Sequence, residues 1–437
     1  MERSEPQAVV FDDPRVAKLI RDGVCTRCRG VKLLCGMPKC PIIEKFYEPQ
    51  RRMFPGMPGS VSTDLIGDSP PGVFIGHYGW PKVSIGPLIP PEEGDTSLLD
   101  TPERWVGRPL DEIVGMRLSL VRGKHTVDAR HPTEGGRIAD LVQEMALCGE
   151  SVESEAKFAK PPFGRFVDGE AQPVGPSAPI IKLSLGTAKA DQRIEKASGD
   201  TDLRAAPALV SLFDDGALVS KLQRAFSAGL FGVKNARRFV PTRWSITAVD
   251  DTIGRELVRR VKEEPVIETC QVHEFRNLED FFIVLFYPAT WRYESIEAWF
   301  PGTTWNPIGA DWTMIGDFEY HRPRRAYAQM GGCYYAARLA SCEELVRMKK
   351  QAGVLVLRES YPGHLMPVGV WNVRETIRAA MKVAPMEFEG LRPALEHVFS
   401  RLVIPRQSWV KYSSLLKDML YQRRLEDFER RAASGSA

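Results

Sequence analysis

Four cysteines near the start of the chain are spaced so that their thiolates can meet at one point. They lie within sixteen residues, in the segment CTRCRGVKLLCGMPKC, at Cys25, Cys28, Cys35 and Cys40. Four soft sulfur ligands suit a tetrahedral Zn²⁺ ion or an iron–sulfur cluster. The spacing therefore predicts a metal-binding module over residues 1–45, with zinc preferred to a cluster. Two disulfides, or four unrelated thiols, are the alternative interpretation.

Charged residues suited to phosphodiester or base-removal chemistry occur between positions 243 and 374. The candidates are Arg243, Asp250, Asp251, Glu319, Glu359 and Arg374. Paired carboxylates can hold Mg²⁺ for nuclease-like cleavage, and an arginine can stabilise the charge that develops on the phosphoryl oxygens. A glycosylase-like site would instead need one carboxylate and an aromatic pocket for a flipped base. The aromatic candidates for such a pocket are Trp291, Tyr293, Trp299 and Trp305.

Structural roles compete with both kinds of chemistry. Asp250 and Asp251 precede Thr252, so they can cap the start of a helix, with Arg243 in a structural ion pair. The tryptophan-rich stretch can equally belong to the core.

Two basic clusters stand beside aromatic residues. The first contains Lys234, Arg237, Arg238 and Arg243, and the second contains Arg322, Arg324 and Arg325. The neighbouring aromatics are Phe239, Trp244, Tyr320 and Tyr327. Guanidinium groups neutralise phosphates and aromatic rings stack on unpaired bases, so these clusters predict a surface that faces DNA. A solvated face with core aromatics beneath it is the alternative.

The last thirty residues predict a helical tail that carries a docking peptide. Residues 409–431 are amphipathic and contain neither Gly nor Pro. Within them, Gln422, Leu425 and Phe428 form a Q-x-x-L-x-x-F pattern, which resembles the box by which repair proteins bind the sliding clamp (PCNA). Glu429 stands where the full box has a second aromatic residue. Alternatively, Leu425 and Phe428 are the inner face of a docked terminal helix.

Five further sequence segments, spread over nearly the whole chain, carry a resemblance to a known family. They are GHYGWPKV (76–83), GPSAP (175–179), RFVPTRWSITAVDD (238–251), GGCYYAARL (331–339) and GVWNVRE (369–375). Together with the cysteines and the tail, they resemble the archaeal Nre family of DNA-repair proteins. His77 departs from the basic residue expected at its position. The resemblance implies a large N-terminal region, a smaller C-terminal region and a clamp-binding tail, which we place at residues 46–290, 291–408 and 409–437.

Composition limits the class of protein. The chain has 437 residues, of which 43% are hydrophobic and 26% charged, with a net charge of +3. The longest apolar run, at residues 281–287, is too short to span a bilayer. The first fifteen residues contain no apolar signal segment. We therefore expect a cytoplasmic protein that contacts no membrane, in which DNA binding depends on local basic clusters.

The apolar pattern predicts a mixed α/β (α+β) fold, with a sheet-and-helix body between the cysteine module and the helical tail. We expect strands at residues 73–76, 82–85, 281–287 and 354–357. We expect helices at residues 137–148, 336–352 and 375–383, and further helical structure over 203–230. Residues 149–179 are expected to form a loop. Two functions fit this sequence. One is a DNA-processing enzyme recruited by the clamp, and the other is a non-catalytic adaptor that binds DNA or a repair partner.

Overall fold

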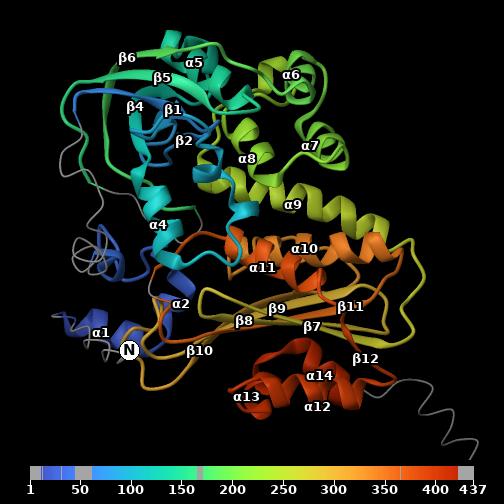
Figure 1. Cartoon of the computed structure of the whole chain (residues 1–437). Helices are drawn as coiled ribbons and strands as arrows, with labels where there is room; N and C mark the ends of the chain where they lie inside the picture. Colours follow the sequence, from blue (N-terminus) through green and yellow to red (C-terminus); the bar gives the residue numbers. More distant parts are fainter. Residues whose placement is uncertain are drawn as a thin grey trace, which may run out of the picture.

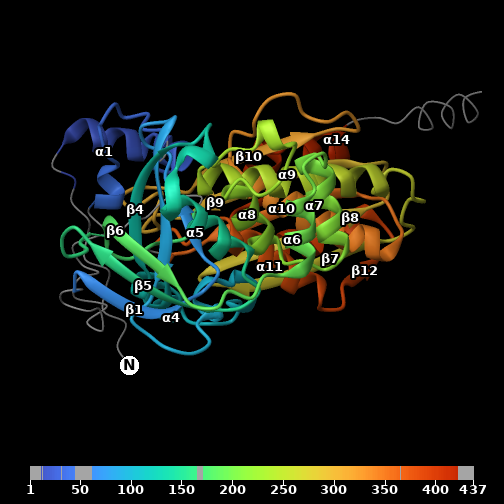
Figure 2. The ribbon, with the colours of Figure 1, turned by 90° about the horizontal axis from the view of Figure 1, so that it is seen from above.

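The computed structural model describes residues 11, 13–30, 32–44, 62–164, 171–364 and 366–421. Within these residues the strands form two six-stranded sheets, one in each half of the chain, and helices pack on both. Figure 1 shows the first sheet at the upper left, with the second sheet lying below the long helices. Figure 2, seen from above, shows strands β1, β4, β5 and β6 of the first sheet beside β7, β8 and β12 of the second. This mixture of helices and strands confirms the predicted mixed α/β class.

The first sheet has the strand order β1-β5-β6-β4-β3-β2. Its strands are β1 (Asp64–Ser69), β2 (Val73–Ile75), β3 (Lys82–Ile89), β4 (Val121–Asp128), β5 (Val152–Phe158) and β6 (Ser177–Leu185). Strands β4 and β6 pair in parallel, and the other neighbours pair antiparallel. Helix α5 (Gly136–Leu147) packs on this sheet through Leu141, which lies in one apolar cluster with Phe158 and Ile180.

The second sheet has the order β10-β9-β11-β8-β7-β12 and is covered on both faces. Its strands are β7 (Cys270–Asn277), β8 (Asp280–Tyr287), β9 (Arg292–Trp299), β10 (Thr313–Glu319), β11 (Gly353–Ser360) and β12 (Met386–Phe388). Alternate residues of β8 enter two different cores, Phe282 on one face and Phe281 on the other. Because both faces are buried, the strand is apolar throughout. Residues 290 and 291, our expected region border, lie between two strands of this sheet.

Helices pack on each face of the second sheet (Figure 1). They are α10 (Gly332–Met348) and α11 (Trp371–Met381) on the first face, with α9 (Thr242–Val261) packed on α10, and α12 (Leu391–Arg401), α13 (Arg406–Tyr412) and α14 (Ser414–Tyr421) on the second face. The remaining helices are α1 (Pro14–Arg21), α2 (Val24–Cys28), α4 (Leu110–Ser119), α6 (Gln192–Gly199), α7 (Ala205–Asp214) and α8 (Val219–Ser227). Among the described helices, none is long and apolar enough to cross a bilayer.

The expected loop over residues 149–179 is wrong, because this stretch contains β5 and the start of β6. Buried and exposed side chains alternate strictly along Val152–Phe158, as in a strand with one face on the core. Ser154 and Ala156 are among the buried residues, so the inward face is small and weakly apolar. The two faces of the strand therefore differ little in hydrophobicity, and many Gly and Pro residues are nearby, so the sequence pattern did not predict the strand.

Two helix predictions also need correction. Asp250 and Asp251 lie in the middle of α9, which begins at Thr242, so they do not cap a helix. The expected continuous helix from residue 409 is interrupted at Ser413, between α13 and α14. The carboxylate of Glu294 in β9 accepts hydrogen bonds from the backbone N–H groups of Ser414 (2.8 Å) and Leu415 (2.9 Å). A buried side chain from another element thus caps a new helix there, which sequence periodicity cannot indicate.

Candidate functional site

The four cysteines of the N-terminal segment line one small cavity of about 20 Å³. All four are unpaired thiols. Burial and the neighbouring sulfurs raise the pKa of Cys25 to about 12, and burial raises that of Cys40 to about 11. In the described residues, no group of three or more possible metal ligands is close enough together to hold an ion. The donor set and the shared cavity fit a zinc ion, but the sulfurs are not in coordination geometry.

The cysteine segment is anchored to the second sheet by buried contacts. Arg29, just after α2, forms an ion pair with Glu297 of β9. Glu297 also pairs with Arg358 (3.1 Å), which in turn pairs with Asp280 (2.7 Å). Thr26 contacts Thr313 through the two hydroxyl groups at 2.6 Å. The contacts of Arg29 and Thr26 join residues more than 260 positions apart, and sequence reasoning did not find them.

Two of the catalytic candidates meet in a buried ion pair. Nη1 of Arg374 lies 2.9 Å from both carboxylate oxygens of Asp250, and Gln223 donates to one of them at 2.9 Å. Arg374 also pairs with Glu375 at 3.0 Å. Asp250 is fully buried, and burial raises its pKa although Arg374 opposes the shift. The pair joins α9 to α11, an arrangement typical of a structural tie rather than a solvent-reached metal site.

The other acidic candidates are also engaged. Arg338 of α10 joins Asp251 to Glu319, and Nε1 of Trp291 donates to Glu319 at 3.2 Å. Glu359 is remote from them and accepts the backbone N–H groups of Val403 (3.0 Å) and Ile404 (2.8 Å). The structure therefore brings Asp251 and Glu319 together but separates Glu359 from them. A catalytic role for these residues, and for half-buried Arg243 at the start of α9, stays a prediction.

The aromatic candidates do not form a base-sized pocket. Trp291 and Tyr293 are buried in the core beneath α10, where the Tyr293 hydroxyl donates to the Tyr334 carbonyl at 2.8 Å. Trp299 and Trp305 are buried in a separate cluster against the cysteine segment. The expected pocket is therefore wrong, and the core interpretation is confirmed.

An exposed tryptophan pair is the aromatic feature that the structure adds. Trp80 follows β2 and Trp244 lies in the first turn of α9, and their ring centroids are 5.2 Å apart. Their exposed fractions are 38% and 44%, and Tyr78 in the same loop is 73% exposed. The two rings are in contact and Tyr78 lies in the same loop, so the exposed aromatics are grouped, as at interaction surfaces. Sequence reasoning found Trp244 but missed Trp80, because nothing local predicts that they meet.

The basic candidates divide into exposed and structural residues. Lys234, Arg238, Arg322 and Arg325 are exposed. Arg237 instead donates to the carbonyls of Gly232 (2.8 Å) and Asp200 (2.9 Å), and Arg324 pairs with Asp317. Arg238 lies a few residues before the start of α9, and Trp244 lies in its first turn, so this exposed cation is close in the chain to an exposed ring. The four exposed cations can reach a phosphate backbone, whereas Arg237 and Arg324 are held by these internal contacts.

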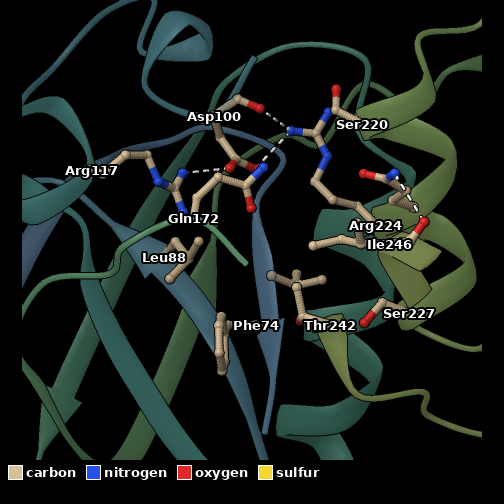
Figure 3. A pocket seen from close by; sticks show the side chains of 12 residues that line it. Phe74, Leu88, Asp100, Arg117, Gln172, Ser220, Arg224, Ser227, Thr242 and Ile246 are labelled. Carbon is tan, nitrogen blue, oxygen red and sulfur yellow. Dashed lines mark hydrogen bonds and ion pairs between the residues drawn. The ribbon is translucent and has the colours of Figure 1, made fainter. Parts of the chain in front are cut away.

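A cavity of about 30 Å³ lies between the first sheet and helices α8 and α9 (Figure 3). Its lining side chains are Val73, Phe74, Leu88, Asp100, Arg117, Gln172, Ser220, Gln223, Arg224, Ser227, Thr242 and Ile246. At one end, Asp100 lies between two arginines: Oδ1 is 2.5 Å from Arg117 and Oδ2 is 2.8 Å from Arg224. Phe74 and Thr242 lie at the other end (Figure 3). No sequence motif predicted this site.

Comparison with known proteins establishes the family. The family models described as "Archaeal Nre, N-terminal" and "Archaeal Nre, C-terminal" match residues 34–306 and 319–428. The chain belongs to the archaeal Nre family. This confirms the family suggested by the sequence segments. The first match begins after Cys25 and Cys28, so it includes only half of the cysteine set.

Curated Nre relatives match over most of their length. DNA repair protein NreB of Archaeoglobus fulgidus is 39% identical over 398 residues, which cover 90% of this chain and 97% of the relative. DNA repair protein NreA of the same organism is 34% identical, covering 85% and 92%. NreA of Haloferax volcanii is 31% identical, covering 78% and 83%. No solved structure matches the chain.

Proposed function

We propose that this Nre protein acts in the repair of damaged DNA and is recruited to DNA by the sliding clamp. The observation that carries the proposal is the match to relatives named DNA repair proteins, over 90% of this chain and 97% of the relative in one case. A match of that extent includes both sheets and the helices around them. Shared architecture over the whole chain favours a shared cellular role.

The exposed tryptophan pair and the exposed cations support contact with DNA. Trp80 and Trp244 present rings on which unpaired bases can stack. Lys234 and Arg238 are exposed shortly before Trp244 in the chain and can neutralise phosphates. Stacking with charge neutralisation is the pattern of proteins that bind single strands, so we propose that this surface takes unpaired DNA.

We propose that Cys25, Cys28, Cys35 and Cys40 hold a zinc ion, with an iron–sulfur cluster as the alternative. Their common cavity and unpaired thiols support this assignment. A bound zinc ion would cross-link the segment around α1 and α2. Through Arg29 and Thr26, the segment would then hold its position on the second sheet.

The geometry favours an adaptor as the second candidate function. Each of the four acidic candidates is engaged: Asp250 with Arg374, Asp251 and Glu319 with Arg338, and Glu359 with backbone N–H groups. A catalytic magnesium site needs carboxylate oxygens that are open to the ion. An adaptor would bind the clamp and DNA without forming a product.

Recruitment can be tested by titrating the full-length protein into the sliding clamp of the same organism by calorimetry. Gln422, Leu425 and Phe428 lie outside the described residues, so the proposal rests on their pattern. We expect Phe428→Ala to weaken binding at least about tenfold, because it removes the apolar anchor of a short groove-bound helix. The matched control Glu429→Ala, one residue further, should bind like the wild type.

The clamp must first be shown to bind another partner's peptide. If this competent clamp then binds neither the wild type nor the variants, recruitment by the tail is wrong. Equal binding by the wild type and Phe428→Ala would also contradict it. The proposed role in DNA repair would in that case rest on family membership alone.

A further inference from the structure

The cavity between the first sheet and helices α8 and α9 carries more positive than negative charge. Two guanidinium groups, Arg117 and Arg224, share the single carboxylate of Asp100, which leaves one net positive charge on this wall. The next carboxylates are directed elsewhere: Glu103 accepts from Ser220, and Asp250 pairs with Arg374. A buried charge without a counter-charge is costly, so an anion that entered here would relieve the cost.

Both arginines keep donor groups that have no acceptor within the described chain. Nε and Nη1 of Arg117 donate to Pro173, Leu99 and Asp100. Nη1 of Arg224 donates twice to Asp100, while its buried Nε donates to nothing in the described chain. Nη2 of each guanidinium likewise has no bonded acceptor among these residues. Arg224 can therefore offer Nε and Nη2 to an oxyanion as two parallel N–H bonds, and Arg117 can add Nη2.

A third arginine increases the positive charge nearby. Arg122 of β4 is 6% exposed and lies over the ring of Phe74, which lines the cavity, at 4.2 Å from the centroid. It forms no ion pair with a carboxylate of the described residues, and burial lowers its pKa to about 10. Burial and the neighbouring charge of Arg224 also lower the pKa of Arg117, although Asp100 opposes that shift. The cavity therefore has two buried cations around the Asp100 carboxylate at one end and a third cation behind Phe74 at the other.

The size and lining of the cavity select the kind of anion. A volume of about 30 Å³ exceeds the space of one water molecule and is too small for a whole nucleotide. Thr242 lines the cavity, and its oxygen accepts the Ile75 N–H at 2.9 Å, so the hydroxyl hydrogen is available to a ligand. We propose that this cavity binds one phosphate group, held by Arg117 and Arg224, either as free phosphate or as the phosphate monoester end of a larger molecule.

The test uses inorganic phosphate as the probe, titrated by calorimetry into the full-length protein in chloride buffer of matched ionic strength. Arg224→Gln should weaken binding at least about tenfold, since charged hydrogen bonds are lost. The control Arg392→Gln changes an arginine whose side chain is 91% exposed, and it should bind like the wild type. Absence of phosphate binding by the wild type, or equal weakening in both variants, would overturn the proposal.

Arg224→Gln also removes one ion-pair partner of Asp100, which weakens the fold, so the wild type is tested directly as well. In a crystal grown with selenate, an anomalous peak between Arg117 and Arg224 would support the site. Selenate found only elsewhere would overturn it. Two further titrations show whether the bound phosphate is free or belongs to a larger molecule. The first uses a nucleoside monophosphate. The second compares a short DNA strand that has a 5′-phosphate with the same strand that has a 5′-hydroxyl. The proposal does not depend on clamp binding, so the two can fail separately.

Discussion

At the scale of single residues, His273 makes stability depend on pH. It lies in β7, is 3% exposed and contacts the ring of Phe286 at 5.3 Å between centroids. Within the described chain neither ring nitrogen meets the strict geometry of a hydrogen bond, although the backbone groups of Ala380 and Val383 lie near the ring and oppose the lowering of its pKa. Burial lowers the pKa of His273 below its usual 6.5, an effect that nearby Arg347 reinforces and Glu344 opposes. The folded protein thus holds this ring neutral where the unfolded chain would protonate it.

The unfolded chain binds the extra proton below pH 6.5, so the free energy of unfolding should fall as pH decreases from that value. The fall contributed by one such group is at most about 1.4 kcal/mol per pH unit. His273→Phe should flatten the dependence, measured as urea midpoints between pH 7.5 and 5. The exposed His131→Gln serves as control and should keep the wild-type slope. Identical slopes for the wild type and His273→Phe would contradict this assignment.

Residue types and local spacing predicted some of the candidate site but not its pairings. The cysteines do line one cavity, and Lys234 and Arg238 are exposed as a DNA-facing surface requires. The partners of the acidic candidates were not predictable, because Asp250 and its partner Arg374 are 124 positions apart. Pairing across that distance is decided by the packing of α9 and α11 against α10, which a single sequence does not reveal.

At the scale of elements, strong periodicity gave correct predictions and tertiary contacts explain the failures. The run at 281–287 is β8, and the helical period from residue 137 is α5. By contrast, the inward face of β5 is weakly apolar, and the break before α14 depends on Glu294 of a distant strand. Neither the strand β5 nor the break before α14 produces a recognisable signal in the local hydrophobic pattern.

The segment around α1 and α2 should depend on metal as a unit. We expect elemental analysis to find about one zinc per chain, and Cys28→Ser to lose it, because three thiolates hold the ion far less tightly than four. Hydrogen exchange in residues 13–44 should then accelerate while the two sheets stay protected. Cys148→Ser, at a buried cysteine beyond α5, should keep the metal. Iron with visible absorption, or zinc retained by Cys28→Ser, would contradict the zinc assignment.

At the scale of the whole molecule, contacts between distant segments build the surface that we assign to DNA. Trp80 lies in the loop between β2 and β3, and Trp244 lies in α9. The hydroxyl of Thr242 accepts the backbone N–H of Ile75 at 2.9 Å, which ties the two segments together. The cysteine segment is tied to the loop before α10, where the ammonium group of Lys32 donates to the carbonyl of Gln329 at 2.9 Å. A net charge of only +3 means that binding must depend on such local groupings.

This arrangement predicts a preference for unpaired DNA. The double variant Trp80→Ala/Trp244→Ala should bind a single-stranded oligonucleotide at least about tenfold more weakly, since each stacked base contributes about 1–3 kcal/mol. Tyr421→Ala, which removes an aromatic residue that is 72% exposed at the end of α14, should bind like the wild type. Fluorescence anisotropy over a range of salt concentrations measures both effects. Replacement of Arg238 by Ala should reduce the salt dependence instead, because it removes a phosphate contact and leaves the stacking surface in place. Equal affinity for single strands and duplexes, unchanged by the double variant, would contradict the assignment of this surface.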